Sequence, residues 1–277
     1  MTNRRKRVGI SVMRWLALAA IAGATAPAWT AAQQATTTDQ PGSIERLNAL
    51  AGEEDYHALM RKLAIPDRPD LPQLFFCGDS ISQHNAPSVK VALCNRFDVT
   101  HWLDLPTRYP QSVPRTPYSG TSELLIEMLT AVLNSADYHP TYLVLNAGLH
   151  DATYEIPVEQ YRANLIQVVK LANEHHAKMV WMLTTPRTKG HPHNNRIDSY
   201  NVAAREVMAE HDVPIIDLHR FVLDAVANDG EPMTYNGDDV HYAVPVRNRM
   251  GAFLGEQLRK IFKEDLAPAK CARDATN

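Results

Sequence analysis

The sequence predicts an α/β fold, a three-layer α/β/α sandwich with a central parallel sheet of five strands. From residue 74 onward, apolar runs of strand length alternate with amphipathic segments of helix length. This alternation is typical of a parallel sheet covered by helices on both faces. The apolar runs are also nearly continuous around Val144, Val180 and Ile215, as strands buried on both faces require.

The first 32 residues are typical of a secretory signal peptide, which is removed from the mature protein. Basic residues at 4–7 precede an apolar stretch from Trp15 to Ala24, and small residues follow at 30–32. The apolar stretch is shorter than the roughly 20 residues that cross a bilayer. We therefore expect a periplasmic or secreted protein with no stable membrane insertion after cleavage.

The mature chain carries a net negative charge. The segment 1–32 holds five of the 28 Lys and Arg residues and none of the 31 Asp and Glu residues, so the remaining chain carries a net charge of −8. Proteins that bind nucleic acid present a basic stripe or patch, and none is present in the mature sequence. We therefore expect no nucleic-acid partner.

The region before the main domain divides into a linker and a helical segment. Residues 33–42 are polar and aperiodic, as in a flexible linker. Charged residues and leucines then alternate at helical spacing to residue 64, with Ser43 as N-cap and Glu45 in the first turn. The expected organisation is a signal peptide (1–32), a linker (33–42), a helical extension (43–72), a main domain (73–263) and a polar tail (264–277).

The main domain begins where three prolines between 66 and 72 end the extension and lead into a strand. Strands are expected at the apolar runs 74–77, 97–103, 141–147, 178–184 and 213–217. Helices are expected at the amphipathic segments 87–96, 121–135, 157–176, 196–211 and 246–263. Ligands bind outside the carboxyl ends of parallel strands. Polar residues at that edge, such as Ser80, Gly120, His150 and Arg187, are therefore the site candidates.

Two short motifs carry the residues that nucleophilic catalysis needs. Gly78-Asp79-Ser80 follows the first expected strand, and Asp238-Asp239-Val240-His241 lies before the last expected helix. A serine hydroxyl is a weak nucleophile unless a base takes its proton, and a third group must orient that base. His241 can serve as the base. Because Asp238 lies three positions earlier, a loop turn can bring its carboxylate to Nδ1 of His241 and leave Nε2 for Ser80.

The order of these residues, with the serine first and the Asp and His close together at the end, resembles the GDSL, or SGNH, hydrolase family. The G-x-S-x-G motif of the α/β-hydrolases is not found. The resemblance covers residues 74–263 and implies a flavodoxin-like fold with a catalytic triad of Ser80, Asp238 and His241. Asp239 competes as the partner of His241, but the two-residue gap in the family pattern favours Asp238.

The resemblance also implies three donors for the oxyanion that forms during acyl transfer. In the family these are the N–H of the serine, the N–H of a glycine and the side chain of an asparagine. Ser80 matches the first. Gly120 lies in the loop before an expected helix and is the candidate for the second, although a glycine there can equally serve only to lead into the helix.

The third donor is where the sequence departs from the family pattern. The block Gly-x-Asn-Asp reads Gly148-Leu149-His150-Asp151 here. His150 can replace the asparagine, because its Nδ1 lies as many bonds from the backbone as the amide nitrogen and donates in one neutral tautomer. Asn146 is a second, less favoured candidate, whose other role is to hold the loop together. Asp151 is expected to brace the loop.

No metal or organic cofactor is expected. The pairs His175-His176 and His191-Pro192-His193 lack the carboxylate or cysteine spacing of the usual zinc sites. Cys77 falls in an apolar strand and Cys94 on an apolar helix face, so two small buried side chains are favoured over a disulfide between them. Cys271 lies in the polar tail.

The resemblance implies two-step ester hydrolysis through an acyl-enzyme on Ser80. We expect a small-molecule or glycan ester as substrate, with a small acyl group such as acetyl. Two other functions stay open. One is an acyltransferase that uses the same triad and passes the acyl group to a hydroxyl instead of water. The other is a glycan- or protein-binding module that has kept the fold and lost activity.

Overall fold

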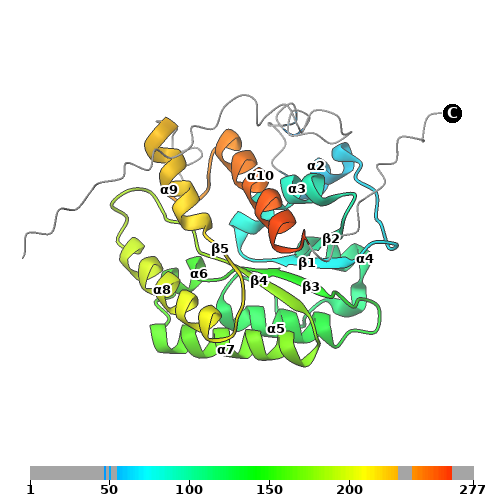
Figure 1. Ribbon diagram of the computed structural model, residues 1–277, viewed down its shortest axis with the longest axis horizontal. Helices are drawn as coiled ribbons and strands as arrows, with labels where there is room; N and C mark the ends of the chain where they lie inside the picture. Colours follow the sequence, from blue (N-terminus) through cyan, green and yellow to red (C-terminus); the bar gives the residue numbers. More distant parts are fainter. Residues whose placement is uncertain (1–46, 48–49, 51–54, 230–238, 264–277) are drawn as a thin grey trace, which may run out of the picture. The chain divides into compact units, whose positions relative to one another are not determined.

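The structure confirms the predicted fold class. The computed structural model describes residues 47, 50, 55–229 and 239–263. In this part of the chain the strands form one all-parallel sheet in the order β2-β1-β3-β4-β5 (Figure 1). The strands are β1 (Gln73–Cys77), β2 (Asp98–His101), β3 (Tyr142–Leu145), β4 (Lys178–Met182) and β5 (Ile215–Ile216). This is the flavodoxin-like order.

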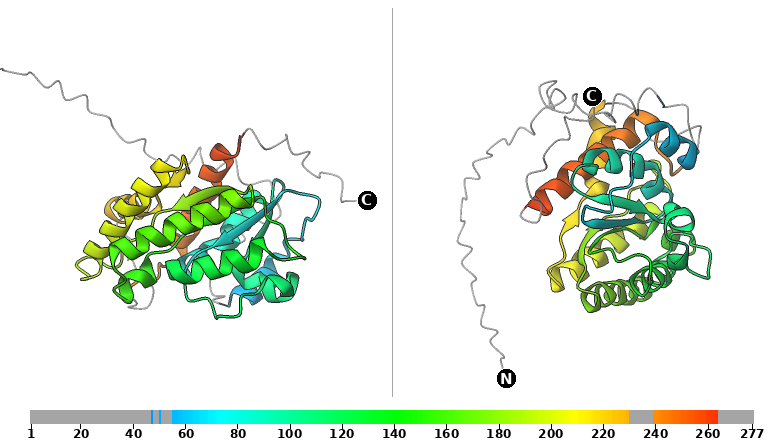
Figure 2. Two further views of the ribbon diagram at one scale, coloured as in Figure 1. Left: turned by 90° about the horizontal axis from the view of Figure 1, so that it is seen from below. Right: turned by 90° about the vertical axis from the view of Figure 1, so that its right-hand side faces the viewer.

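Helices cover both faces of the sheet. Helices α3 (Ser80–Leu93) and α10 (Val244–Ile261) lie on one face, and α5 (Ser122–Leu133), α7 (Val158–Glu174) and α8 (Asn194–Glu210) lie on the other (Figures 1 and 2). The shorter elements are α2 (Tyr56–Leu63), α4 (Leu105–Arg108), α6 (Leu149–Thr153) and α9 (Leu218–Asp229), with 3₁₀ turns at Trp102–Asp104 and Pro110–Ser112. The three-layer arrangement buries the strands on both faces, as their apolar runs predict.

Helices α3 and α10 pack unusually closely, and this contact bears on the site. A Cβ added to Gly251 would lie 2.2 Å from Cβ of Ser88, and one added to Gly255 would lie 2.4 Å from Cβ of Ala92. Glycine is therefore needed at both positions of α10. Since Ser80 begins α3 and α10 follows the loop of His241, this packing fixes the two chain segments that carry the predicted nucleophile and base.

Among the differences from the sequence prediction, three concern the start of α3, helix α9 and the end of β2. The helix expected at 87–96 begins at Ser80, because Asp79 caps it by accepting a hydrogen bond from the N–H of Ile81 (2.9 Å). Pro87 lies inside α3. Helix α9 was not predicted. Strand β2 ends at His101, because the next residues form a 3₁₀ turn that His101 caps.

The helical extension is described only in part. Helix α2 begins after Asp55, whose carboxylate accepts a hydrogen bond from the N–H of Ala58 (2.6 Å). Ser43 and Glu45 lie outside the described residues, as do the expected signal peptide (1–32), linker (33–42) and tail (264–277). The extension packs on the main domain through Tyr56, which is buried in the core.

A buried polar network joins α2, α3 and the segment after β2. The ammonium group of Lys90 lies 2.6 Å from the carboxylate of Asp104. The same carboxylate accepts hydrogen bonds from the hydroxyl of Tyr56 (3.1 Å) and the N–H of His101 (2.8 Å). Each added donor offsets part of the cost of burying the ion pair. The network therefore links the extension to the helix that begins at Ser80.

His101 makes the free energy of unfolding depend on pH. Burial lowers the pKa of its imidazole to about 3, whereas an unfolded histidine titrates near pH 6.5. The unfolded chain therefore binds a proton that the native protein does not, and the free energy of unfolding falls as the pH drops from about 6.5 towards 3. His101 contributes up to about 1.4 kcal/mol per pH unit.

Urea unfolding of the wild type and of His101→Gln at several pH values in that window measures this contribution. The variant should lose less stability than the wild type as the pH falls, because glutamine does not titrate. Carboxylates shared by both proteins cancel in the comparison. Equal pH slopes in the two proteins would contradict the prediction.

Candidate active site

The candidate residues meet at the switch point of the sheet. Strands β1 and β3 are neighbours, but the chain leaves β1 for α3 on one face and leaves β3 for the helices of the other face (Figure 1). Flavodoxin-like folds bind their ligands at such a point, outside the carboxyl ends of the strands. Ser80 follows β1 and His150 follows β3, so both lie at this edge.

Ser80 and His241 are in direct contact. Nε2 of His241 lies 2.7 Å from Oγ of Ser80, although the two residues are 161 positions apart in the chain. Ser80 is the first residue of α3. The first N–H groups of a helix have no acceptor within the helix, so the N–H of Ser80 can serve a substrate oxygen. The predicted nucleophile and base are thus brought together.

The third member of the predicted triad lies outside the described residues. Asp238 is not described, and its role stays a prediction. Its competitor Asp239 is engaged elsewhere, because its carboxylate lies 2.8 Å from Nε2 of His191 and 3.1 Å from the guanidinium of Arg187. These contacts favour Asp238 over Asp239 as the partner of His241.

Gly120 lies close to both Asp79, the residue before Ser80, and His150. Its φ of +83° is in the region that favours glycine. A Cβ at this position would lie 2.9 Å from Cβ of Asp79 and 3.0 Å from the ring carbon Cδ2 of His150. The backbone of Gly120 therefore approaches both the residue before Ser80 and the imidazole of His150, and its role as an oxyanion donor stays a prediction.

The side chain of Asn146 is engaged in hydrogen bonds to residues at the end of β4. Its amide nitrogen donates hydrogen bonds to the carbonyl of Met182 (2.9 Å) and to Oγ1 of Thr184 (3.4 Å). The side chain is buried and ties the end of β3 to the end of β4. These contacts support the loop-holding role of Asn146 and favour His150 as the third oxyanion donor, an assignment that stays a prediction.

Asp151 holds α6 against the start of α5. Its buried carboxylate accepts hydrogen bonds from both the N–H (3.0 Å) and the hydroxyl of Ser122. Asn164 donates to the same hydroxyl (2.9 Å). Burial raises the pKa of Asp151. Because Ser122 lies two residues after Gly120, these bonds fix the distance between the two proposed donors Gly120 and His150.

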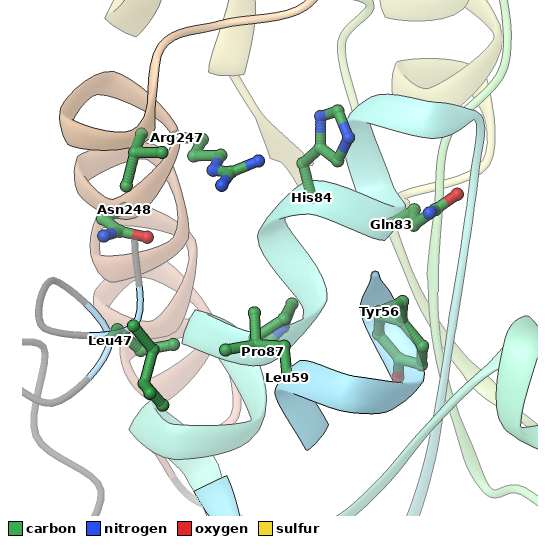
Figure 3. Close-up of a pocket in the computed structure, with 10 residues that line it drawn as sticks. Leu47, Tyr56, Leu59, Gln83, His84, Pro87, Arg247 and Asn248 are labelled. Atoms are coloured by element: carbon green, nitrogen blue, oxygen red, sulfur yellow. The ribbon is translucent and has the colours of Figure 1, made fainter. Parts of the chain in front are cut away.

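A small cavity lies behind the nucleophile helix, between α2, α3 and α10 (Figure 3). Its volume of about 20 Å³ has room for about one water molecule. Figure 3 shows Arg247 extending from α10 towards His84 of α3. The ring of His84 packs edge-on against that of His241, with centroids 4.9 Å apart. His84 therefore packs directly against the imidazole of His241.

A larger groove lies at the opposite edge of the sheet. It has a volume of about 360 Å³ and is lined at the amino ends of β4 and β5 by residues such as Lys178 and Val213. Neither this groove nor the small cavity is lined by Ser80, Gly120 or His150.

Other expectations concern metals, disulfides and membranes. Within the described ranges, no group of three or more His, Cys, Asp and Glu side chains is placed to hold a metal ion. Cys77 and Cys94 are both free thiols. The prediction of two buried side chains holds for Cys77 and only in part for Cys94, which is half-buried; Cys271 lies outside the described residues. The helices of the described part include none that is long and apolar enough to span a bilayer.

The sequence indicated Arg187 only as a polar residue at the correct edge. In the structure its guanidinium contacts Asp239 and donates a hydrogen bond to Oγ1 of Thr153 (2.6 Å). The order of residues in the chain gives no sign of these contacts. They join Arg187 to Thr153 and to Asp239, which lie 34 and 52 positions away in the chain.

Comparisons with known proteins agree with this fold. No curated protein matches the chain. Among solved structures, the esterase EstA from Pseudoalteromonas sp. superposes with a TM-score of 0.53 and 15% identity, over 69% of this chain and 98% of its own. The lipase/acylhydrolase from Enterococcus faecalis superposes with a TM-score of 0.51 and 17% identity, over 73% of this chain and 100% of its own.

An acetyl xylan esterase, AlAXEase, has the same fold, with a TM-score of 0.51 and 13% identity over 69% of this chain and 99% of its own. At such identities these likenesses show the fold. The model of the GDSL-like Lipase/Acylhydrolase family matches residues 76–243, a segment that includes Ser80, Gly120, His150 and His241 and more than half of the chain. The chain therefore belongs to the GDSL-like lipase/acylhydrolase family.

Proposed function

We propose that this protein is a serine esterase that works through an acyl-enzyme on Ser80. The observation that carries the proposal is the 2.7 Å contact between Oγ of Ser80 and Nε2 of His241. His241 takes the proton of Ser80 as Oγ attacks the acyl carbon, and then gives it to the departing alcohol oxygen. In the second step His241 takes a proton from water, the water oxygen attacks the acyl group, and the proton returns to Oγ of Ser80.

The charge that develops on the carbonyl oxygen is held by hydrogen-bond donors. The N–H groups of Ser80 and Gly120 and the side chain of His150 are proposed for this role. The close approach of Gly120 to Asp79 and His150 supports the assignment. Such donors stabilise the transition state because they are already in place before the charge forms.

The substrate is proposed to be an ester of a small acyl group such as acetyl, on a carbohydrate. Tyr154 is 60% exposed, and its ring centroid lies 6.3 Å from that of His150. An exposed aromatic ring with a polar hydroxyl suits stacking against a sugar. A protein exported by the segment 1–32, as proposed, would meet glycans in the periplasm or outside the cell.

A panel of p-nitrophenyl esters of increasing chain length tests the acyl preference. The purified mature protein should have its highest kcat/KM on the acetate, with values that fall as the chain lengthens. Higher activity on long chains would favour a lipase. No turnover on any ester, with the fold intact by circular dichroism, would favour a binding module.

An acetylated oligosaccharide tests the carbohydrate part of the proposal. Tyr154→Ala should raise KM for the oligosaccharide and leave p-nitrophenyl acetate turnover unchanged. Val202→Ala, a change at a comparably exposed apolar residue of α8 (56%), is the matched control and should change neither.

Adding a free sugar as acceptor identifies an acyltransferase, because the acetyl group would then appear on the sugar and not as acetate.

A further inference from the structure

Arg187 lies between the two parts of the active site. Nη2 donates to Oγ1 of Thr153 at the end of α6 (2.6 Å), and Nη1 lies 3.1 Å from the carboxylate of Asp239. Thr153 ends the short helix that carries His150, and Asp239 lies two residues before His241. One guanidinium therefore contacts both the segment of the proposed oxyanion donor and the segment of the base.

We propose that Arg187 is a positioning residue that holds α6 and the loop of His241 at a fixed separation. The inference rests on the proposed esterase function. Planar guanidinium groups suit this task, because their donors form a rigid fork that fixes two acceptors at once. A lysine ammonium is a single point charge and offers no such fork.

Arg187 is itself held firmly. Its side chain is only 12% exposed. Its backbone N–H donates to the side-chain oxygen of Asn194 at the start of α8 (2.9 Å), and the amide nitrogen of Asn194 donates back to the carbonyl of Thr188 (3.0 Å). The guanidinium therefore extends from a fixed point of the loop after β4, and displacement of α6 or of the His241 loop breaks one of its bonds.

Other contacts keep the His241 loop folded without Arg187. The N–H of Thr188 donates to the carbonyl of Asp239 (3.0 Å), and the hydroxyl of Tyr242 donates to the carbonyl of Pro186. Nδ1 of His191 accepts from the N–H of His193 (3.2 Å), so Nε2 carries the hydrogen and donates to Asp239 (2.8 Å). Loss of Arg187 should therefore shift the loop relative to α6 and leave both segments folded.

Small shifts of this kind have large effects on turnover, because a displacement of about 1 Å can slow a reaction by about 100-fold. We expect Arg187→Met to lower kcat on p-nitrophenyl acetate by about 10- to 100-fold and to leave KM within about twofold. Arg187→Lys should recover only part of kcat. Thr153→Val, which removes one of the two acceptors, should lower kcat by a smaller factor.

Two further measurements separate positioning from a purely structural role. Millimolar guanidinium should restore part of the kcat of Arg187→Ala and have no effect on the wild type. The double variant Arg187→Met/Asp239→Asn should be no slower than the slower single variant, because both changes break the same contact. A Tm close to that of the wild type for Arg187→Met or Arg187→Lys shows that folding is kept.

Arg162→Met is the matched control. Arg162 also bridges two carboxylates, at 2.6 Å from Glu206 and 2.7 Å from Glu210, but it joins α7 to α8 away from Ser80, so kcat should not change. If the wild type turns over the ester and Arg187→Met has the same kcat, the inference is overturned and the proposed function stays intact. An effect on KM alone would also overturn it, because Arg187 would then contact the substrate. Absence of turnover in the wild type would refute the proposed function itself.

Discussion

Replacing Ser80 with alanine should lower kcat on p-nitrophenyl acetate by about 10⁴-fold or more. The reason is that Oγ of Ser80 lies 2.7 Å from Nε2 of His241, the predicted base. Without it no acyl-enzyme forms, and the remaining oxyanion donors can assist only slow direct attack by water. Initial rates of p-nitrophenol release from the wild type and the variant measure the effect.

Ser88→Ala is the control for the loss of Ser80. Ser88 is a buried serine two turns further along α3, and its replacement should leave kcat within about twofold. A fluorophosphonate probe should add one adduct to the wild type, at Ser80 by peptide mapping, and none to Ser80→Ala. A variant that keeps wild-type turnover, or an adduct at another serine, would refute the assignment of the nucleophile.

Replacing His150 with alanine should lower kcat by about 100-fold or more, the usual cost of removing one oxyanion donor. His150→Asn and His150→Gln then identify the donating nitrogen, because asparagine places its amide nitrogen near the Nδ1 position and glutamine near the Nε2 position. If Nδ1 of His150 is the donor, His150→Asn should restore most of kcat. Recovery by glutamine alone would assign the hydrogen bond to Nε2.

Asn146→Ala distinguishes the second candidate. Its amide donates to the carbonyl of Met182 and to Thr184, so the change should lower the free energy of unfolding by about 1–3 kcal/mol and leave kcat of the folded protein largely unchanged. Urea unfolding and initial rates on the same preparation give both quantities. A collapse of kcat in Asn146→Ala with near-normal turnover in His150→Ala would show that the assignment is wrong.

Most of the fold could be predicted because it depends on local patterns. Apolar runs of strand length around Val144 and Val180 mark strands buried on both faces, and the structure places them in the centre of the parallel sheet. The start of α3 could not be predicted. The amphipathic segment predicted a start at residue 87, whereas the capping carboxylate of Asp79 begins the helix at Ser80. A cap is decided by backbone geometry that the residue types alone do not specify.

By itself the sequence determined the α/β class, the edge of the sheet where a site would form, and the residues Ser80 and His241. These follow from periodicity and from the chemistry of the side chains. Only the tertiary structure decided that Asn146 holds β3 to β4, that Gly120 approaches His150, and that Arg187 joins α6 to Asp239. The physical reason is that such contacts depend on side-chain directions and loop paths between segments far apart in the chain, which neither spacing nor residue type encodes.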